Sequence, residues 1–352
     1  MKISVGTIVK SVMVLVFLGV VAVGGYMVYN RLPALIDEFS PRSDRAAVSP
    51  GQEVVIEIPK GATLSQVATI LEDKGVISSR LVFKLVAMIR GEQRKIKAGD
   101  YALKTGSDAG HVLDQLISGK TLVFYFTVPE GYNIFELADL FRQWGMMSRE
   151  DFLATVRDKA FIKDLGVDAD SLEGYLFPDT YFVRASEKHD GKKMIRRMVK
   201  RFQKVYAANV RATAEKFGWR TNQVVTLASL IEKEARASEH ALVSAVFHNR
   251  LRRGMRLQCD PTVIYGIKPM GSKITRADLE RKHPYNTYQN LGLPPGPIAS
   301  PGKASLIAAV KPADVDYLYF VAKNDGTHQF SKSLKEHNRS VNLYQRKSHN
   351  RN

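Results

Sequence analysis

The feature that most constrains this chain of 352 residues is an apolar run close to its N-terminus. Ser11 to Tyr29 are 19 successive residues without a charge. A helix of that length covers ~28 Å at 1.5 Å rise per residue, which matches the hydrocarbon core of a bilayer. We therefore expect residues 1–30 to form a short cytoplasmic stub followed by a transmembrane helix.

The charges beside this run predict its orientation. Lys2 and Lys10 precede it, so the positive-inside rule places the N-terminus in the cytoplasm and the rest of the chain outside. The alternative is a cleaved signal peptide with a small-residue site near Ala22-Val23-Gly24. A retained anchor is favoured because the apolar run continues past that site, and the two tyrosines at its end are typical of a membrane interface.

Composition limits what the rest of the chain can be. Hydrophobic residues make up 45% and charged residues 25%, which excludes wholesale disorder and a polytopic membrane fold. The single cysteine, Cys259, excludes intramolecular disulfides and multi-thiolate metal sites. Lys2 and Lys10 are the only charges among residues 1–30, so the remaining chain keeps +15 of the net +17. That charge favours anionic lipid or an anionic polymer as partner, and outside the cytoplasm nucleic acid is not expected.

We expect an α+β fold in which a linker and two domains follow the anchor. Residues 31–51 mix Pro, Ser and charge without apolar periodicity and are interpreted as the linker. Residues 52–128 are predicted to form a small β-α-α-β module, and residues 129–345 a mixed α/β domain before a basic tail at 346–352. The elements expected in the module are strands at 54–58, 101–103 and 122–128, and helices at 64–75, 79–90 and 109–117.

A short sequence motif occurs twice, once near the start of each predicted domain. Ile58-Pro-Lys-Gly61 matches Val128-Pro-Glu-Gly131 at a spacing of 70 residues, and each motif precedes a predicted helix that closes at a glycine. The pattern favours a strand–turn–helix unit used twice, although chance similarity between generic strand–turn–helix segments stays open. Farther along, a single basic helix is predicted near residues 192–215, with one apolar face and one face of Lys and Arg. Its basic face is either a solvated surface or a contact with anionic lipid or wall polymer.

Several familiar active-site motifs can be excluded. The sequence has no Gly-x-Ser-x-Gly elbow and no His-Glu-x-x-His pair. Gly296 to Ala304 superficially suggests a phosphate loop, but five residues separate its glycines and Ala304 stands where Ser or Thr would bind magnesium. The remaining candidates for an active site are two clusters of carboxylate and other polar side chains.

The first candidate cluster lies on a predicted helix from Thr221 to Ala235. Glu232 and Glu234 flank its predicted buried stripe on opposite sides, and periodicity alone does not choose between them. A carboxyl partly covered by apolar surface is disfavoured in its charged form, which keeps a general acid protonated near neutral pH. A solvated Glu-Lys-Glu face is the alternative.

The second cluster consists of segments rich in turn formers and hydrogen-bonding side chains. They are Gln258-Cys-Asp-Pro-Thr262, Tyr285-Asn-Thr-Tyr288 and Gly292-Leu-Pro-Pro-Gly-Pro-Ile298. Such loops could present amides, hydroxyls and aromatic faces to a ligand with many hydroxyls, for which a carbohydrate is the best candidate. Structural turns are the alternative.

With these segments in view, the chain resembles the endolytic murein transglycosylase family, the MltG or YceG-like proteins of the bacterial inner membrane. The matching blocks follow one another in family order: Leu172–Tyr181, Leu227–Glu234, Val246–Leu251, Met255–Tyr265, Tyr285–Tyr288, Gly292–Gly296 and Tyr317–Val321. The resemblance implies a LysM-like module at 52–128, a catalytic domain at 129–345, and Glu232 as the catalytic residue. It also implies a single-pass inner-membrane protein with a cytoplasmic N-terminus and a periplasmic catalytic domain. Cys259 departs from the family pattern, which has a hydroxyl residue there.

The resemblance also predicts the substrate-binding residues and the chemistry. The residues expected to bind the glycan strand are Glu173, Tyr175, Asn249, Gln258, Asp260, Thr262, Tyr285, Asn286 and Tyr288. Among them Tyr288 and Asn286 are ranked above Asp260 as direct contacts, because Asp260 beside a proline is equally suited to forming a turn.

The reaction implied is cleavage of the MurNAc–GlcNAc β-1,4 bond within nascent peptidoglycan strands, which leaves a 1,6-anhydro-MurNAc end and terminates elongation. One carboxyl is sufficient because the muramic acid's own C6 hydroxyl is the nucleophile, so no metal or organic cofactor is expected. Expected partners are glycan strands, the inner membrane and peptidoglycan synthases (penicillin-binding proteins). The alternative is a non-catalytic, membrane-anchored peptidoglycan-binding protein.

Overall fold

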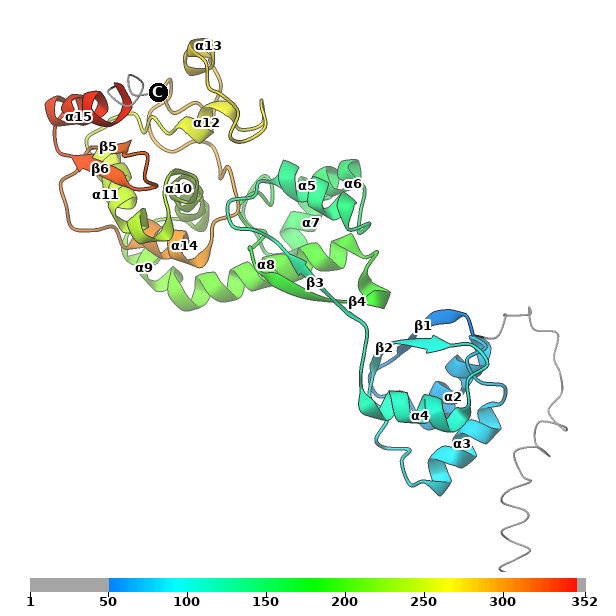
Figure 1. Ribbon diagram of the computed structural model, residues 1–352. Helices are drawn as coiled ribbons and strands as arrows, with labels where there is room; N and C mark the ends of the chain where they lie inside the picture. Colours follow the sequence, from blue (N-terminus) through cyan, green and yellow to red (C-terminus); the bar gives the residue numbers. More distant parts are fainter. Residues whose placement is uncertain (1–50, 347–352) are drawn as a thin grey trace, which may run out of the picture. The chain divides into compact units, whose positions relative to one another are not determined.

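The computed structural model describes residues 51–346, which form two compact units (Figure 1). The first unit contains residues 51–124 and 184–186, and the second contains residues 125–183 and 187–346. The predicted transmembrane run, almost all of the linker and nearly the whole basic tail lie outside the described residues. Within residues 51–346, no helix combines the length and apolar character needed to cross a bilayer.

The first unit has the predicted β-α-α-β order. Its elements are β1 (Glu53–Ile58), α2 (Leu64–Asp73), α3 (Arg80–Ile89), β2 (Gly99–Lys104) and α4 (Ala109–Ser118). β1 and β2 pair antiparallel, with Glu53 opposite Lys104 and Ile58 opposite Gly99. The strands and the three helices enclose one apolar core that includes Leu71, Phe83 and Leu113, each completely buried. The helices and the first two strands predicted for this module are confirmed, whereas the strand expected at 122–128 forms β3 (Val123–Thr127), which crosses the boundary between the units at residues 124 and 125.

The second unit begins with a strand pair and a group of helices. Its elements up to residue 216 are β3 (Val123–Thr127), α5 (Ile134–Gln143), α6 (Arg149–Thr155), α7 (Lys159–Asp164), β4 (Thr180–Arg184), α8 (Gly191–Asn209) and α9 (Arg211–Lys216). The 3₁₀ turn η1 (Ala185–Glu187) after β4 lies mostly in residues 184–186, which belong to the first unit. β3 pairs with β4. The prediction of one basic helix at 192–215 was wrong, because the backbone leaves helical geometry at Val210 (φ −126°, ψ −44°) and separates α8 from α9.

The repeated motif forms the same local structure in both places. After β1 and after β3, the glycine of the Pro-x-Gly turn takes a positive φ, +81° at Gly61 and +76° at Gly131, which favours glycine. A capping box then starts the helix, built on Thr63 before α2 and on Asn133 before α5. Each helix is followed by a glycine in the left-handed region, Gly75 (φ +69°) and Gly145 (φ +66°).

The rest of the second unit is built around α10. Its elements are α10 (Thr221–Glu234), the turn η2 (Ala237–Glu239), α11 (His240–Arg252), α12 (Asp260–Ile264), α13 (Arg276–Glu280), α14 (Lys303–Val310), β5 (Tyr319–Ala322), β6 (His328–Ser331), α15 (Leu334–Val341) and the π turn η3 (Asn342–Arg346). β5 and β6 form an antiparallel pair. The fold of the described residues is therefore mixed α+β, with three two-stranded sheets.

α10 is confirmed at its predicted position, but its burial is more extensive than predicted. Every residue from Val224 to Ile231 is buried, because α9, α11, α12 and α14 all contact this helix. The buried stripe predicted from the sequence covered only one side of the helix. A helix buried all round carries no amphipathic signal, so the sequence pattern under-reports its burial. Its C-terminal turn emerges partly from this core and bears Glu232 and Glu234.

Candidate active site

Glu232 is held by two donors from the start of α14. Its Oε2 accepts the Gly302 backbone N–H at 2.9 Å and the Ser305 hydroxyl. Gly302 is the N-cap of α14, so the Glu232 carboxylate lies at the N-terminus of this helix. The buried body of α10 fixes the backbone of Glu232, while the residue itself stays partly accessible.

A second carboxylate, Glu130, lies against the same glycine. A Cβ added to Gly302 would lie 1.9 Å from Glu130 Oε1, so any larger residue at position 302 would displace this carboxyl. Glu130 is an exposed residue, yet partial burial of its carboxyl and the negative charge of Glu232 raise its pKa, and the nearby His240 lowers it. Glu130 and Glu232 are therefore close enough for their charges to interact.

The turn that carries Glu130 is fixed to both α10 and the segment before α14. The Gly131 N–H donates to the Ser300 carbonyl at 2.9 Å, and the Ser300 N–H donates to the Tyr132 carbonyl at 2.7 Å. The Lys233 ammonium donates to the Gly131 carbonyl at 3.1 Å. The second copy of the Pro-x-Gly turn thus forms one wall of the site around Glu232.

Behind Glu232 lies a buried histidine. The Ser305 hydroxyl is 3.2 Å from His240 Nδ1, and His240 Nε2 is 2.9 Å from the Ala235 carbonyl oxygen. His240 is 3% exposed and Ser305 is fully buried. The cluster around Glu232 therefore contains two carboxyls, one imidazole and one hydroxyl.

Glu234 has different surroundings. Burial raises its pKa to about 7, while a hydrogen bond from the Cys259 thiol lowers it and the charge of Asp260 raises it further. The geometry distinguishes the two glutamates that the sequence pattern left equivalent. Glu232 joins the cluster of ionisable groups, whereas Glu234 is held among the residues that lead into α12.

Five of the predicted substrate-binding residues are buried and serve the scaffold. Glu173 accepts the Ile134 N–H at 3.0 Å and the Tyr265 hydroxyl at 2.8 Å, and burial raises its pKa to about 7. The side-chain amide of Asn286 donates to three backbone carbonyls, and its oxygen accepts the Tyr288 N–H. The other three are Tyr175, Asn249 and Thr262. Their burial favours structural roles over the direct contact that the sequence predicts.

The other four remain accessible to a ligand. Gln258 is exposed and adopts a positive φ of +53°. The Tyr288 hydroxyl donates to Asp260 Oδ1 at 2.5 Å, so these two side chains form one polar surface beside α12. Tyr285 is half-buried and belongs to a different feature, a pocket near the start of α10.

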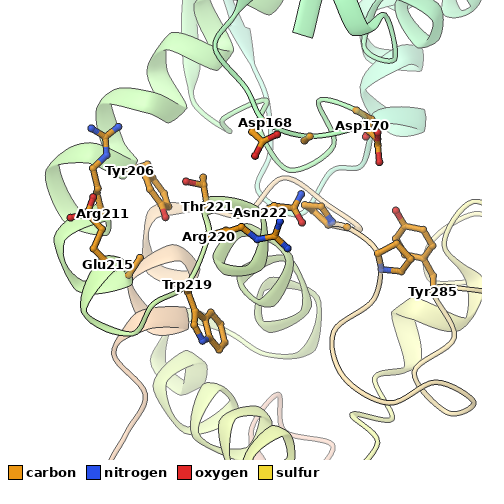
Figure 2. Close-up of a pocket in the computed structure, with 16 residues that line it drawn as sticks. Asp168, Asp170, Tyr206, Arg211, Glu215, Trp219, Arg220, Thr221, Asn222 and Tyr285 are labelled. Atoms are coloured by element: carbon orange, nitrogen blue, oxygen red, sulfur yellow. The ribbon is translucent and has the colours of Figure 1, made fainter. Parts of the chain in front are cut away.

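This pocket, of about 670 Å³, has a polar and aromatic lining (Figure 2). Tyr285 lies on one side and Trp219 and Arg220 on another, while Asp168 and Asp170 border it from the loop before β4. Thr221 and Asn222 also line it, so it opens at the N-terminal end of α10. Glu232 lies about 16 Å farther along the helix axis, so the pocket and the glutamate cluster are separate features.

The family profile described as YceG-like matches residues 56–343, which is most of the chain. The protein belongs to the YceG-like family. Its curated relatives include the endolytic murein transglycosylase of Bacillus subtilis, 36% identical over 83% of this chain and 84% of the relative. The endolytic murein transglycosylase of Streptococcus pneumoniae strain D39 is 30% identical over 93% of this chain and 63% of the relative.

A solved structure gives the same family. The 2.6 Å crystal structure of a YceG-like protein from Listeria monocytogenes has 36% sequence identity and a TM-score of 0.58. The match covers 82% of this chain and 98% of that chain. The family resemblance predicted from the motif blocks is confirmed.

Sequence reasoning missed three members of the site, Glu130, His240 and Ser305. The repeated Pro-x-Gly turn was a usable signal for Glu130, because it occupies the position of Lys60 in the first copy. The segment from Gly296 to Ala304, excluded as a phosphate loop, supplies Gly302 to the Glu232 carboxylate instead. His240 and Ser305 carry no local pattern, since only the packing of α11 against α14 brings them together.

Proposed function

We propose that this protein is an endolytic lytic transglycosylase that cleaves the MurNAc–GlcNAc β-1,4 bond within peptidoglycan glycan strands. Two relatives of that name, 36% and 30% identical to this chain, support the reaction class. The observation in the site that carries the proposal is the Glu232 carboxyl. It is partly accessible, lies at the end of a buried helix, and has two fixed donors that stabilise its charge.

The proposed reaction uses Glu232 twice. As an acid it protonates the glycosidic oxygen, and the Gly302 N–H and Ser305 hydroxyl stabilise the carboxylate that results. The carboxylate then takes the proton of the muramic acid's C6 hydroxyl, which attacks C1 of the same sugar and closes the 1,6-anhydro ring. Because attacking and leaving groups belong to one bound strand, the step gains from proximity. The sequence-level prediction that no cofactor is required follows from this use of one carboxyl.

Hydrolysis is the second candidate reaction, and Glu130 is the observation that favours it. Glycoside hydrolases use two carboxyls, one as acid and one to activate water or attack the sugar. Glu130 and Glu232 both lie against Gly302. The two reactions differ in product, because hydrolysis leaves a reducing MurNAc end and transglycosylation leaves an anhydro end.

Digestion of purified glycan strands tests both the reaction and the residue assignment. The wild-type protein should release anhydro-MurNAc products that mass spectrometry detects. Glu232→Gln should abolish them, while the matched variant Glu234→Gln should keep substantial activity. Loss of activity in Glu234→Gln but not in Glu232→Gln would show that the wrong glutamate has been assigned.

We further propose that the pocket at the start of α10 binds part of the strand remote from the bond that is cut. Its carboxylates, guanidinium groups and aromatic rings are the groups that bind sugars and their charged substituents. Tyr285→Ala should raise KM more than it lowers kcat. An unchanged KM in a folded Tyr285→Ala protein would exclude this role.

The proposed cellular setting is the inner membrane, with the catalytic unit in the periplasm beside peptidoglycan synthases. The apolar run from Ser11 to Tyr29 supports the anchor, and the family resemblance supports the synthases. A reporter active only outside the cytoplasm, fused after Asn352, should be active, and the protein should stay in the membrane fraction at full mass. A soluble form shortened by about 25 residues would establish a cleaved signal peptide instead.

For the first unit we propose a LysM-like role in holding peptidoglycan. The β-α-α-β order and the antiparallel β1–β2 pair support this proposal. The full chain should sediment with insoluble peptidoglycan, and removal of residues 52–122 should weaken that binding. Equal binding without these residues would exclude the role.

A further inference from the structure

Ser305 connects the Glu232 carboxyl to a buried imidazole. Its hydroxyl donates to Glu232 Oε2 and lies 3.2 Å from His240 Nδ1. The second ring nitrogen, Nε2, lies 2.9 Å from the Ala235 carbonyl oxygen. Because Ser305 and His240 are buried, these contacts decide where their protons reside.

A count of protons defines two states of these contacts. A carbonyl oxygen only accepts, so His240 Nε2 carries a proton in both states. When Glu232 is ionised and Ser305 donates to it, the contact between Ser305 and His240 is a hydrogen bond only if Nδ1 is protonated too. The ring is then an imidazolium. When Glu232 is protonated, it donates to Ser305, and Ser305 donates to Nδ1 of a neutral ring. Both states contain the same number of protons, and in both states every one of these contacts is a hydrogen bond.

We propose that Ser305 and His240 are positioning residues that form a proton relay to Glu232, with one proton shared between the carboxyl and the imidazole through the Ser305 hydroxyl. The inference rests on the proposed transglycosylase function and deepens it. It gives two residues that lie behind the catalytic carboxyl a defined part in its chemistry.

The transfer is balanced at every step. His240 Nδ1 gives its proton to Ser305 Oγ, and Ser305 gives its own proton to Glu232, which then protonates the glycosidic oxygen. After Glu232 takes the C6 hydroxyl proton of the substrate, the reverse transfer restores the imidazolium. One proton leaves the relay in the first half of the reaction and one returns in the second.

The surroundings of Glu232 explain why a relay is useful. The Gly302 N–H and the Ser305 hydroxyl donate to the carboxylate form of Glu232, whereas a general acid must carry a proton. An imidazolium at His240 holds the required proton while Glu232 keeps both of its hydrogen-bond donors. The proposed relay therefore supplies the proton that Glu232 needs as a general acid.

Other charged groups surround the relay and stay unchanged in the tests below. Glu130 lies on the turn before α5, and its pKa responds to the charges of both Glu232 and His240. Lys233 on α10 bonds to that same turn, and Lys303 begins α14. Glu239, next to His240 in the chain, is paired with His328 of β6.

The test is the pH profile of kcat/KM for anhydro-product release by the full chain and its variants. His240→Asn keeps a hydrogen-bonding group near the Nδ1 position but cannot titrate. Ser305→Ala interrupts the relay. In each variant the alkaline limb should move to lower pH by about one unit or more. The double variant should show no larger shift than either single one, because both changes break the same relay.

Controls separate this shift from damage to the fold. His248→Asn alters another histidine of α11 whose Nε2 contacts a backbone carbonyl, and it should leave the profile in place. Ser305→Thr restores a hydroxyl and should restore the alkaline limb. The relay proposal would be overturned if His240→Asn lowered the rate equally at every pH and left the alkaline limb of the profile unmoved. It would also be overturned if Ser305→Ala kept the alkaline limb of the wild type. A wild-type protein that releases no anhydro product would refute the proposed function instead.

Discussion

Glu173 offers a quantitative test of how the second unit is held together. Its side chain is 2% exposed and accepts hydrogen bonds from the Ile134 N–H, the Gly174 N–H and the Tyr265 hydroxyl. These bonds favour the ionised form, but burial outweighs them and raises the pKa from 4.5 to about 7. Glu173→Gln removes the titration and keeps a group of nearly the same shape.

The sign and size of the effect follow from that pKa. The folded protein binds the Glu173 proton more tightly than the unfolded chain, so the stabilisation is complete below about pH 4.5 and is lost as the pH rises through about 7. A difference of roughly 2.5 pKa units corresponds to about 3 kcal/mol of unfolding free energy. Gln cannot titrate, and its amide loses the bond from Gly174, which costs about 1 kcal/mol at all pH values.

Glu173→Gln should therefore be less stable than the wild type near about pH 4 and more stable near about pH 8. Thermal unfolding of both proteins across this range measures the effect. At roughly 2–4 °C per kcal/mol, the difference between their melting temperatures should change by about 6–12 °C. Parallel pH dependences of the two proteins would refute the reasoning, since they would show that Glu173 does not titrate between these pH values.

Four further predictions concern the site and its scaffold. Gly302→Ala places a methyl group where the Glu130 carboxyl lies and should reduce activity with little change in melting temperature, measured by product release and thermal unfolding. Asn286→Ala removes a buried amide with three carbonyl partners and should cost about 2 kcal/mol or more, seen as a lower melting temperature, in contrast to the substrate contact predicted from the sequence. Tyr288→Phe, which changes an accessible hydroxyl, should lower activity on glycan strands and leave melting nearly unchanged. Arg250→Lys should lower the melting temperature by several degrees, because a single ammonium cannot reproduce a guanidinium that donates to three backbone carbonyls.

The sequence predicts local structure well where one pattern decides it. Apolar periodicity placed α2, α3 and α10, and the Pro-x-Gly turns reappear with the same positive φ in both copies. The break at Val210 was missed because the apolar stripe continues across it from α8 into α9. No sequence pattern marks a helix junction whose two halves bury the same face.

The site is harder to predict than the helix that carries it. The motif blocks select Glu232, but its partners Gly302 and Ser305 come from a segment about 70 residues away, brought in by the packing of α14 on α10. Polar residues such as Asn286 look like binding residues in a sequence, since nothing in a polar loop distinguishes an amide that faces a ligand from one that faces backbone carbonyls.

In the proposed reaction the C6 hydroxyl of the substrate, rather than water, attacks C1 at the bond that Glu232 cleaves. Digestion of glycan strands in water labelled with oxygen-18 tests it most directly, because only hydrolysis places a solvent oxygen on the new MurNAc end. We expect anhydro-MurNAc ends without the label, although Glu130 lies beside Glu232. Reducing MurNAc ends that carry oxygen-18 as the first product would contradict the account and would assign the two carboxyls to a hydrolase.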